Sequence, residues 1–157
     1  MQKITPFLWF DGEAEAAANL YVSLFKNSRI ENINRYGEAG PGQAGTAMTV
    51  SFVLDGVPMT ALNGGPQYKF TEALSLSVAC EDQAEIDRLW EGLGGDGGQP
   101  GPCGWLKDRW GVSWQIVPAN MGELVGGSDP AASKRAMQAM FKMTKLDIAV
   151  LKAARAG

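Results

Sequence analysis

Apolar and polar residues alternate most clearly along residues 112–117. The apolar positions are Val112, Trp114 and Ile116, and the positions between them are Ser113, Gln115 and Val117. This two-residue period is typical of a strand. In the preceding turn, Gly111 supplies the backbone freedom of a tight reversal and Asp108 a side-chain acceptor. The pattern predicts a hairpin of two short strands, whose face bearing Ser113 and Gln115 either lines a cavity or meets water.

The rest of the chain repeats one order of elements, namely a strand, a helix and three strands. Apolar strand patterns lie at 4–10, 29–36, 46–54, 57–62 and 72–80, followed by the hairpin. In each half, apolar residues at helical spacing follow the first strand. Asp11 is the expected N-cap of the first helix, and Asp82 with Glu85 forms a capping-box pattern at the second.

A further helical segment is expected after the hairpin. Asp129 and Pro130 predict a helix start, because proline is favoured at the first helical position. An apolar stripe follows, which we expect to pack on the domain or on a second copy of it, with partner binding as the alternative. Its members are Ala136, Met137, Met140, Phe141 and Thr144.

These elements predict an α+β fold in a single domain, residues 1–157. Residues 1–63 and 72–118 form two βαβββ modules, and residues 128–155 form a C-terminal helical tail. One such module cannot bury both faces of its sheet, so we expect two modules to pair, within one chain or between subunits. The expected product is a curved, mostly antiparallel sheet around a cavity.

Composition excludes several classes of function. The net charge of −3 disfavours a nucleic-acid partner, and no apolar run approaches the ~20 residues of a membrane span. The N-terminal residues show no signal-peptide pattern, and Cys80 and Cys103 lack metal-finger or redox spacing, so we expect a cytoplasmic protein with free thiols. The chain contains no histidine, which excludes His-based catalysis and His-ligated metals within one chain.

Five residues are candidates for binding a ligand: Trp9, Asn63, Cys103, Trp105 and Gln115. The two indoles can stack on a planar ligand or belong to the core. Gln115 can hydrogen-bond a ligand or be a satisfied buried amide, and Asn63 faces a cavity mouth or ends its hairpin. Cys103 is reactive only beside a cation and is otherwise an inert thiol. No residue is assigned a catalytic role.

Five long segments carry a family resemblance. In chain order they are PFLWFDGEAEAAANLY, NGGPQYKFTEA, CEDQAEIDRLW, CGWLKDRWGVSWQIVP and AMQAMFKMTKLDIAVLKAA. They resemble the PhnB-like branch of the vicinal oxygen chelate superfamily, which includes glyoxalase I, bleomycin-resistance proteins and extradiol dioxygenases. This branch often carries the label 3-demethylubiquinone-9 3-methyltransferase. The resemblance implies the paired βαβββ architecture and a homodimer.

The resemblance also implies a divalent metal held by inner-strand side chains, often His and Glu, with a turn of the form D-P-x-G-x-x-x-E. Here that spacing runs from Asp108 to Gln115, so a neutral amide stands where the terminal Glu would be. An amide oxygen is a weak ligand for a catalytic divalent ion. We therefore expect no metal and no other cofactor.

The sequence favours a metal-independent protein that binds a small molecule and forms a homodimer. The alternative is an enzyme. It would be either a methyltransferase acting on a quinone-like aromatic, as the family label implies, or a lyase, isomerase or dioxygenase by analogy with the superfamily. A purely structural dimer module is the third possibility.

Overall fold

The computed structural model describes residues 2–157 and forms two compact units. The first extends to Phe70, and the second is Thr71–Gly157. Their pairing around a cavity, and the single-domain organisation, stay predictions. No helix in residues 2–157 combines the length and the apolar character needed to cross a membrane.

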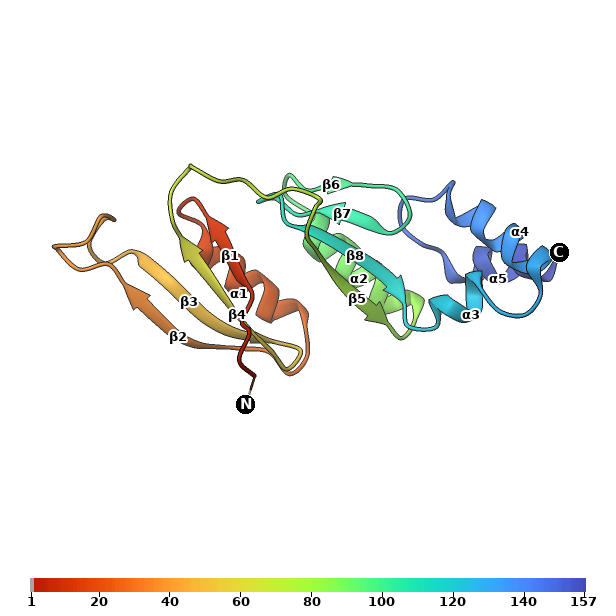
Figure 1. Cartoon of the computed structure of the whole chain (residues 1–157), viewed down its shortest axis with the longest axis horizontal. Helices are drawn as coiled ribbons and strands as arrows, with labels where there is room; N and C mark the ends of the chain where they lie inside the picture. The colour runs from red at the N-terminus through yellow and green to blue at the C-terminus, as the bar shows by residue number, and fades with distance from the viewer. Residues whose placement is uncertain (1) are drawn as a thin grey trace. The chain divides into compact units, whose positions relative to one another are not determined.

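The first unit is one βαβββ module (Figure 1). Its elements are β1 (Phe7–Phe10), α1 (Ala14–Leu24), β2 (Arg29–Arg35), β3 (Ala47–Leu54) and β4 (Val57–Asn63). The strand order in the sheet is β1-β4-β3-β2. The outer strand β1 runs parallel to β4, and the other neighbours are antiparallel.

The second unit contains a βαβββ module with the same strand arrangement. Its elements are β5 (Ser75–Cys80), α2 (Gln83–Gly94), β6 (Gln99–Pro100), β7 (Trp105–Lys107) and β8 (Ser113–Pro118). The order β5-β8-β7-β6, with β5 parallel to β8, matches the first sheet position by position. The α+β class and the repeated βαβββ order predicted from the sequence are therefore confirmed.

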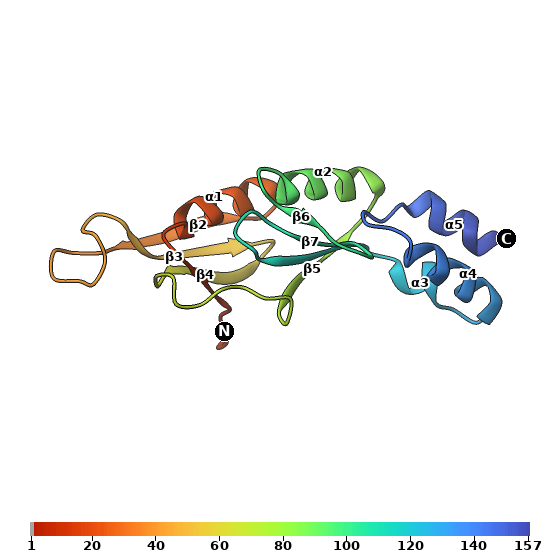
Figure 2. The ribbon, with the colours of Figure 1, turned by 90° about the horizontal axis from the view of Figure 1, so that it is seen from above.

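Each module buries one face of its sheet under its own helix (Figure 2). In the first unit, Tyr21 of α1 is fully buried, with its ring centroid 6.4 Å from that of Phe52. In the second, α2 contributes Ile86, Leu89 and Leu93, all without exposed surface. Burying such side chains contributes about 1.5–3 kcal/mol each, so these contacts dominate the stability of each module.

The two module helices begin in different ways. The predicted capping box at α2 is confirmed, because Asp82 Oδ1 accepts the Glu85 N–H at 2.8 Å and Glu85 Oε2 accepts the Glu81 N–H at 2.7 Å. The prediction that Asp11 caps α1 is wrong, because the helix starts at Ala14. The Ala14 N–H instead donates to the distant Asn63 Oδ1 at 2.9 Å.

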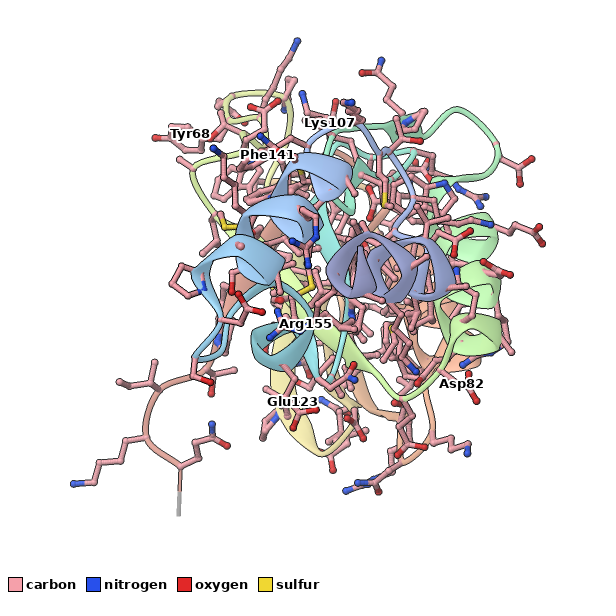
Figure 3. The ribbon with its side chains drawn as sticks, turned by 90° about the vertical axis from the view of Figure 1, so that its right-hand side faces the viewer. Tyr68, Asp82, Lys107, Glu123, Phe141 and Arg155 are labelled. Atoms are coloured by element: carbon pink, nitrogen blue, oxygen red, sulfur yellow. The ribbon has the colours of Figure 1, made fainter. Side chains whose placement is uncertain are left out.

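Three short helices form the tail of the second unit: α3 (Met121–Val125), α4 (Pro130–Met140) and α5 (Ile148–Ala156). The predicted start of α4 is confirmed, with Asp129 as N-cap. Arg155 lies among these helices and donates from Nη1 to Gly126 O at 2.7 Å (Figure 3).

The predicted apolar stripe of the tail packs only in part. Ala136 has no exposed surface, whereas Met137 and Phe141 are exposed. Ala136 thus packs within this unit, and the expectation that the exposed members pack on a second copy of the chain stays a prediction. The buried residues of α4 are the alanines Ala132 and Ala136, and small side chains allow the helices of the tail to pack closely.

The tail is attached to the start of β7. The N–H groups of Cys103 and Gly104 donate to Met143 O at 2.9 Å and Thr144 O at 2.8 Å. Leu146 is fully buried against Gly104, whose backbone φ of +85° lies in the region that favours glycine. A Cβ on Gly104 would lie 2.9 Å from both Leu146 Cδ1 and Ile116 O. The tail therefore depends on glycine at this position.

The β7–β8 hairpin is organised by the buried carboxylate of Asp108. Its Oδ1 accepts the N–H groups of Trp110 and Val112, each at 3.0 Å, and its Oδ2 accepts the Trp114 Nε1–H at 3.0 Å. The expectation that Asp108 stabilises its turn is confirmed. The carboxylate also ties the turn to the largest fully buried side chain, Trp114.

We expect Gly104→Ala to lower the free energy of unfolding more than Gly97→Ala does. Both glycines have positive φ, so each substitution costs roughly 1–2 kcal/mol. Only the Cβ at position 104 would meet other atoms, which adds about 1–3 kcal/mol. Urea denaturation measures both variants, and equal losses would contradict the close packing of the tail on Gly104.

We expect Asp108→Asn to cost about 2 kcal/mol of stability, because an amide N–H replaces one acceptor beside buried donors. The control is Asp96→Asn, since Asp96 is an exposed carboxylate paired with Arg109 at 3.2 Å. Removing such a surface charge changes stability by about 0.5 kcal/mol or less. If thermal unfolding shifts equally in both variants, Asp108 does not organise the hairpin.

Candidate functional site

The sheet face of the second unit opposite α2 carries polar and aromatic side chains. In the register of the strands, Ser75, Ser113 and Lys107 form one row across β5, β8 and β7. Gln115 and Trp105 are direct partners in the next row. Side chains at directly opposed positions lie about 4.5–5.5 Å apart at Cβ, so each row brings its members together on one face.

A cavity of about 370 Å³ opens on the β6–β7 side of this face. Trp105 lines it together with Pro100 and Pro102, and the polar lining includes Lys107, Ser113 and Glu72. Its volume lies within the range of about 300–1,000 Å³ in which small-molecule sites fall. The cavity thus combines a mostly apolar wall with a few polar groups.

Ser113 carries the unusual polar atom of this cavity. The residue is 1% exposed, and its Oγ has no hydrogen-bond partner within residues 2–157. A buried hydroxyl without a partner costs about 1–3 kcal/mol, and native proteins rarely leave one. The Oγ itself has almost no accessible surface, so a molecule in the cavity would reach it only after a local rearrangement.

Lys107 lies directly opposite Ser113 and is paired with Glu72 through Nζ and Oε1. The hydrogen bond from Lys107 holds the pKa of the Glu72 carboxyl below its ordinary value, and the positive charge acts in the same direction. Both groups are partly in water, so the pair contributes little to stability. It does place one cation and one anion on the cavity wall.

Two of the predicted binding residues meet on this face. Trp105 lines the cavity, and Gln115 lies beside it on β8. The Gln115 Nε2 donates to Ser75 Oγ at 2.9 Å, which orients the amide. A ligand-binding role for both residues stays a prediction.

Trp9 and Asn63 lie in the first unit and are engaged by their own module. Trp9 Nε1 donates to Gly65 O at 2.9 Å, and its ring meets Tyr68 edge-on at 5.0 Å between centroids. The Asn63 amide caps α1 through Oδ1 and donates from Nδ2 to Ala47 O at 2.9 Å. These contacts favour a structural role for Asn63.

The two thiols have different surroundings. The Cys103 Sγ is directed to Met140 O at 3.7 Å, toward the tail. Cys80 is buried, and the loss of water raises the pKa of its thiol to about 12, with a further increase from Glu85. A thiol with that pKa stays protonated at neutral pH, so Cys80 is not a nucleophile.

The divalent metal implied by the superfamily does not fit the residues of this face. Its strand donors are the hydroxyls of Ser75, Ser77 and Ser113 and the amide of Gln115, whereas catalytic divalent ions prefer imidazole, thiolate or carboxylate. The nearby Glu72 carboxylate is paired with Lys107. Within residues 2–157, no group of three or more Asp, Glu, Cys or His is placed to hold a metal ion.

The sequence did not identify the contribution of Lys107, Ser113 and Glu72 to one cavity. The alternation around Ser113 showed which face it is on, but the burial of its hydroxyl depends on neighbouring strands. The short strand β6, which brings Pro100 to the cavity, has only two residues and no periodic signal.

Comparisons with known proteins give the following matches. The family model described as 3-demethylubiquinone-9 3-methyltransferase matches residues 2–117. A structure from Bacillus cereus, described as a putative 3-demethylubiquinone-9 3-methyltransferase, PhnB protein, is 41% identical. The match covers 75% of this chain and 100% of that chain, with a TM-score of 0.69. A comparison with curated proteins finds no match.

Two other solved structures are similar at lower levels. A protein from Staphylococcus aureus is 34% identical over 75% of this chain and 97% of that chain, with a TM-score of 0.35. Protein PA1353 from Pseudomonas aeruginosa is 23% identical over 73% of this chain and 95% of that chain; with a TM-score of 0.59, it supports the fold. The family model matches most of the chain, and the repeated βαβββ modules agree with it. This chain therefore belongs to the PhnB-like 3-demethylubiquinone-9 3-methyltransferase family, the branch of the vicinal oxygen chelate superfamily that its sequence resembles.

Proposed function

We propose that this protein binds a small planar molecule, without a metal, in the cavity of the second unit. The observation that carries the proposal is the cavity of about 370 Å³, where Trp105, Pro100 and Pro102 form an apolar wall beside the charged groups of Lys107 and Glu72. A mostly apolar wall with a few polar groups is the usual composition of a small-molecule site.

Trp105 supplies the apolar side of the proposed site. Its half-buried indole lies between the polar rows of the sheet and the chain around Pro100 and Pro102. The prolines have fixed φ angles, so this wall loses little entropy when a ligand binds. Aromatic ligands would stack on the indole or meet its edge.

The family name suggests methyl transfer to a quinone-like aromatic as an alternative, and the superfamily suggests a lyase, isomerase or dioxygenase. Neither the cavity nor the comparisons favour one of these reactions. The donors of the open sheet face do not suit the metal that superfamily chemistry uses. Ligand binding is therefore the function that the geometry supports best.

We further propose that the protein acts as a cytoplasmic homodimer with no nucleic-acid partner. The family resemblance supports dimerisation. The two free cysteines suit a reducing compartment, and the net charge of −3 disfavours polyanions.

The test is a thermal-shift screen of aromatic and quinone-like compounds, followed by calorimetry with Trp105→Leu. We expect the best binder to lose about tenfold in affinity, because an aromatic contact worth about 1.4 kcal/mol is removed. Tyr68→Leu is the control, since Tyr68 is an exposed aromatic residue of the first unit. Binding that depends on Tyr68 and not on Trp105, or no binding by any compound, would contradict the proposal.

A further inference from the structure

We infer that the tail of this chain sets the shape of the cavity, because residues 143–146 hold the loop 101–105 in a conformation that it would not keep alone. The inference rests on the proposed function, because it names what positions the wall of the same site. The residues that do so are Gln83 and Leu146, and neither lines the cavity. The family match covers residues 2–117 and ends before this segment, so these contacts are features that the family model does not describe.

The cavity loop, residues 101–105, lies between the cavity and the tail. Three of its residues line the cavity, namely Gly101, Pro102 and Trp105. The other two, Cys103 and Gly104, donate their backbone N–H groups to the tail carbonyls of Met143 at 2.9 Å and Thr144 at 2.8 Å. One side of this short loop therefore forms the wall of the site while the other is bound to the tail. A displacement of the tail would move the wall.

The cavity loop has a backbone conformation that its own sequence does not favour. Cys103 has a φ of +57°, and Gly104 follows with a φ of +85°. Residues with a Cβ rarely adopt positive φ, because the Cβ comes too close to the following carbonyl oxygen. The two bonds from the tail offset this cost at Cys103. The strand β8 also holds the loop, because the Ile116 N–H donates to Gly104 O at 2.8 Å, so loss of the tail contacts would change the loop without unfolding the sheet.

Gln83 and Leu146 attach the tail segment to the rest of the unit. The Gln83 side chain, at the start of α2, donates from Nε2 to Leu146 O at 2.9 Å and accepts the Ile148 N–H on Oε1 at 2.8 Å. The Leu146 side chain has no exposed surface and lies so close to Gly104 that a Cβ there would be 2.9 Å from Leu146 Cδ1. The amide of Gln83 thus fixes the backbone of the segment, and Leu146 supplies the apolar contact with the loop.

The test combines calorimetry with the planar probe 2-naphthol and amide hydrogen exchange on the full chain. We expect Leu146→Ala and Gln83→Leu to weaken 2-naphthol binding by about tenfold, as follows if the released loop presents Trp105 correctly only about a tenth of the time. Exchange of the Cys103 and Gly104 amides should accelerate relative to the amides of the β5–β8 ladder. Leu146→Met should restore both values, because it nearly conserves the side-chain volume.

Leu89→Ala is the control for a general loss of stability. It removes the same atoms as Leu146→Ala from the buried face of α2, and Leu89 is outside the set of residues that line the cavity. We expect it to lower the stability of the unit while 2-naphthol binding and the exchange ratio stay unchanged. Circular dichroism checks that each variant is folded. If Leu146→Ala does not fold, Gln83→Leu decides, because it leaves the apolar contact in place.

The possible results separate this inference from the proposed function. If the folded variants bind 2-naphthol as tightly as the unsubstituted protein, the inference is overturned while ligand binding stands. An exchange ratio that does not rise in Leu146→Ala or Gln83→Leu overturns it as well, because the tail then does not hold the loop. If the unsubstituted protein does not bind 2-naphthol, the proposed function fails for planar aromatics, and the inference fails with it.

Discussion

The second unit of this molecule depends on the contacts of the Asp108 carboxylate. It accepts two backbone N–H groups of the turn and the indole N–H of Trp114, and it is almost fully buried. A buried charge is stable only when its lone pairs are occupied, so these contacts determine one conformation of the turn. That conformation sets the register of β7 against β8. The register in turn places Lys107 opposite Ser113 and Trp105 opposite Gln115.

The same hairpin shows how the fold is kept while the side chains on its open face differ from the metal ligands that the superfamily resemblance implies. The backbone of the module places inner-strand side chains on the open face of the sheet whatever their identity. Here these side chains are hydroxyls, an amide, an indole and an ammonium, which do not suit divalent metals. Family membership therefore describes the scaffold, and the side chains on that face determine what it can bind.

Much of the fold could be predicted from local pattern. The alternation at 112–117 predicted β8, the Asp82 and Glu85 pair predicted the start of α2, and Asp129 with Pro130 predicted that of α4. Each of these signals acts over a few residues, which is why the sequence shows them. The cap of α1 comes from Asn63, which is 49 residues away from Ala14 in the sequence. The local pattern therefore predicted Asp11 as the cap instead. The cavity depends on contacts of the same long-range kind. The burial of the Ser113 hydroxyl depends on neighbouring strands, so the local sequence does not predict it.

The most direct measurement is a crystal structure of the protein with the strongest binder from the aromatic screen. The account predicts its ring against Trp105, in the cavity that Pro100 and Pro102 also line, with no metal ion beside it. A ligand bound elsewhere on the chain, or a divalent ion held at the open sheet face, would contradict the account.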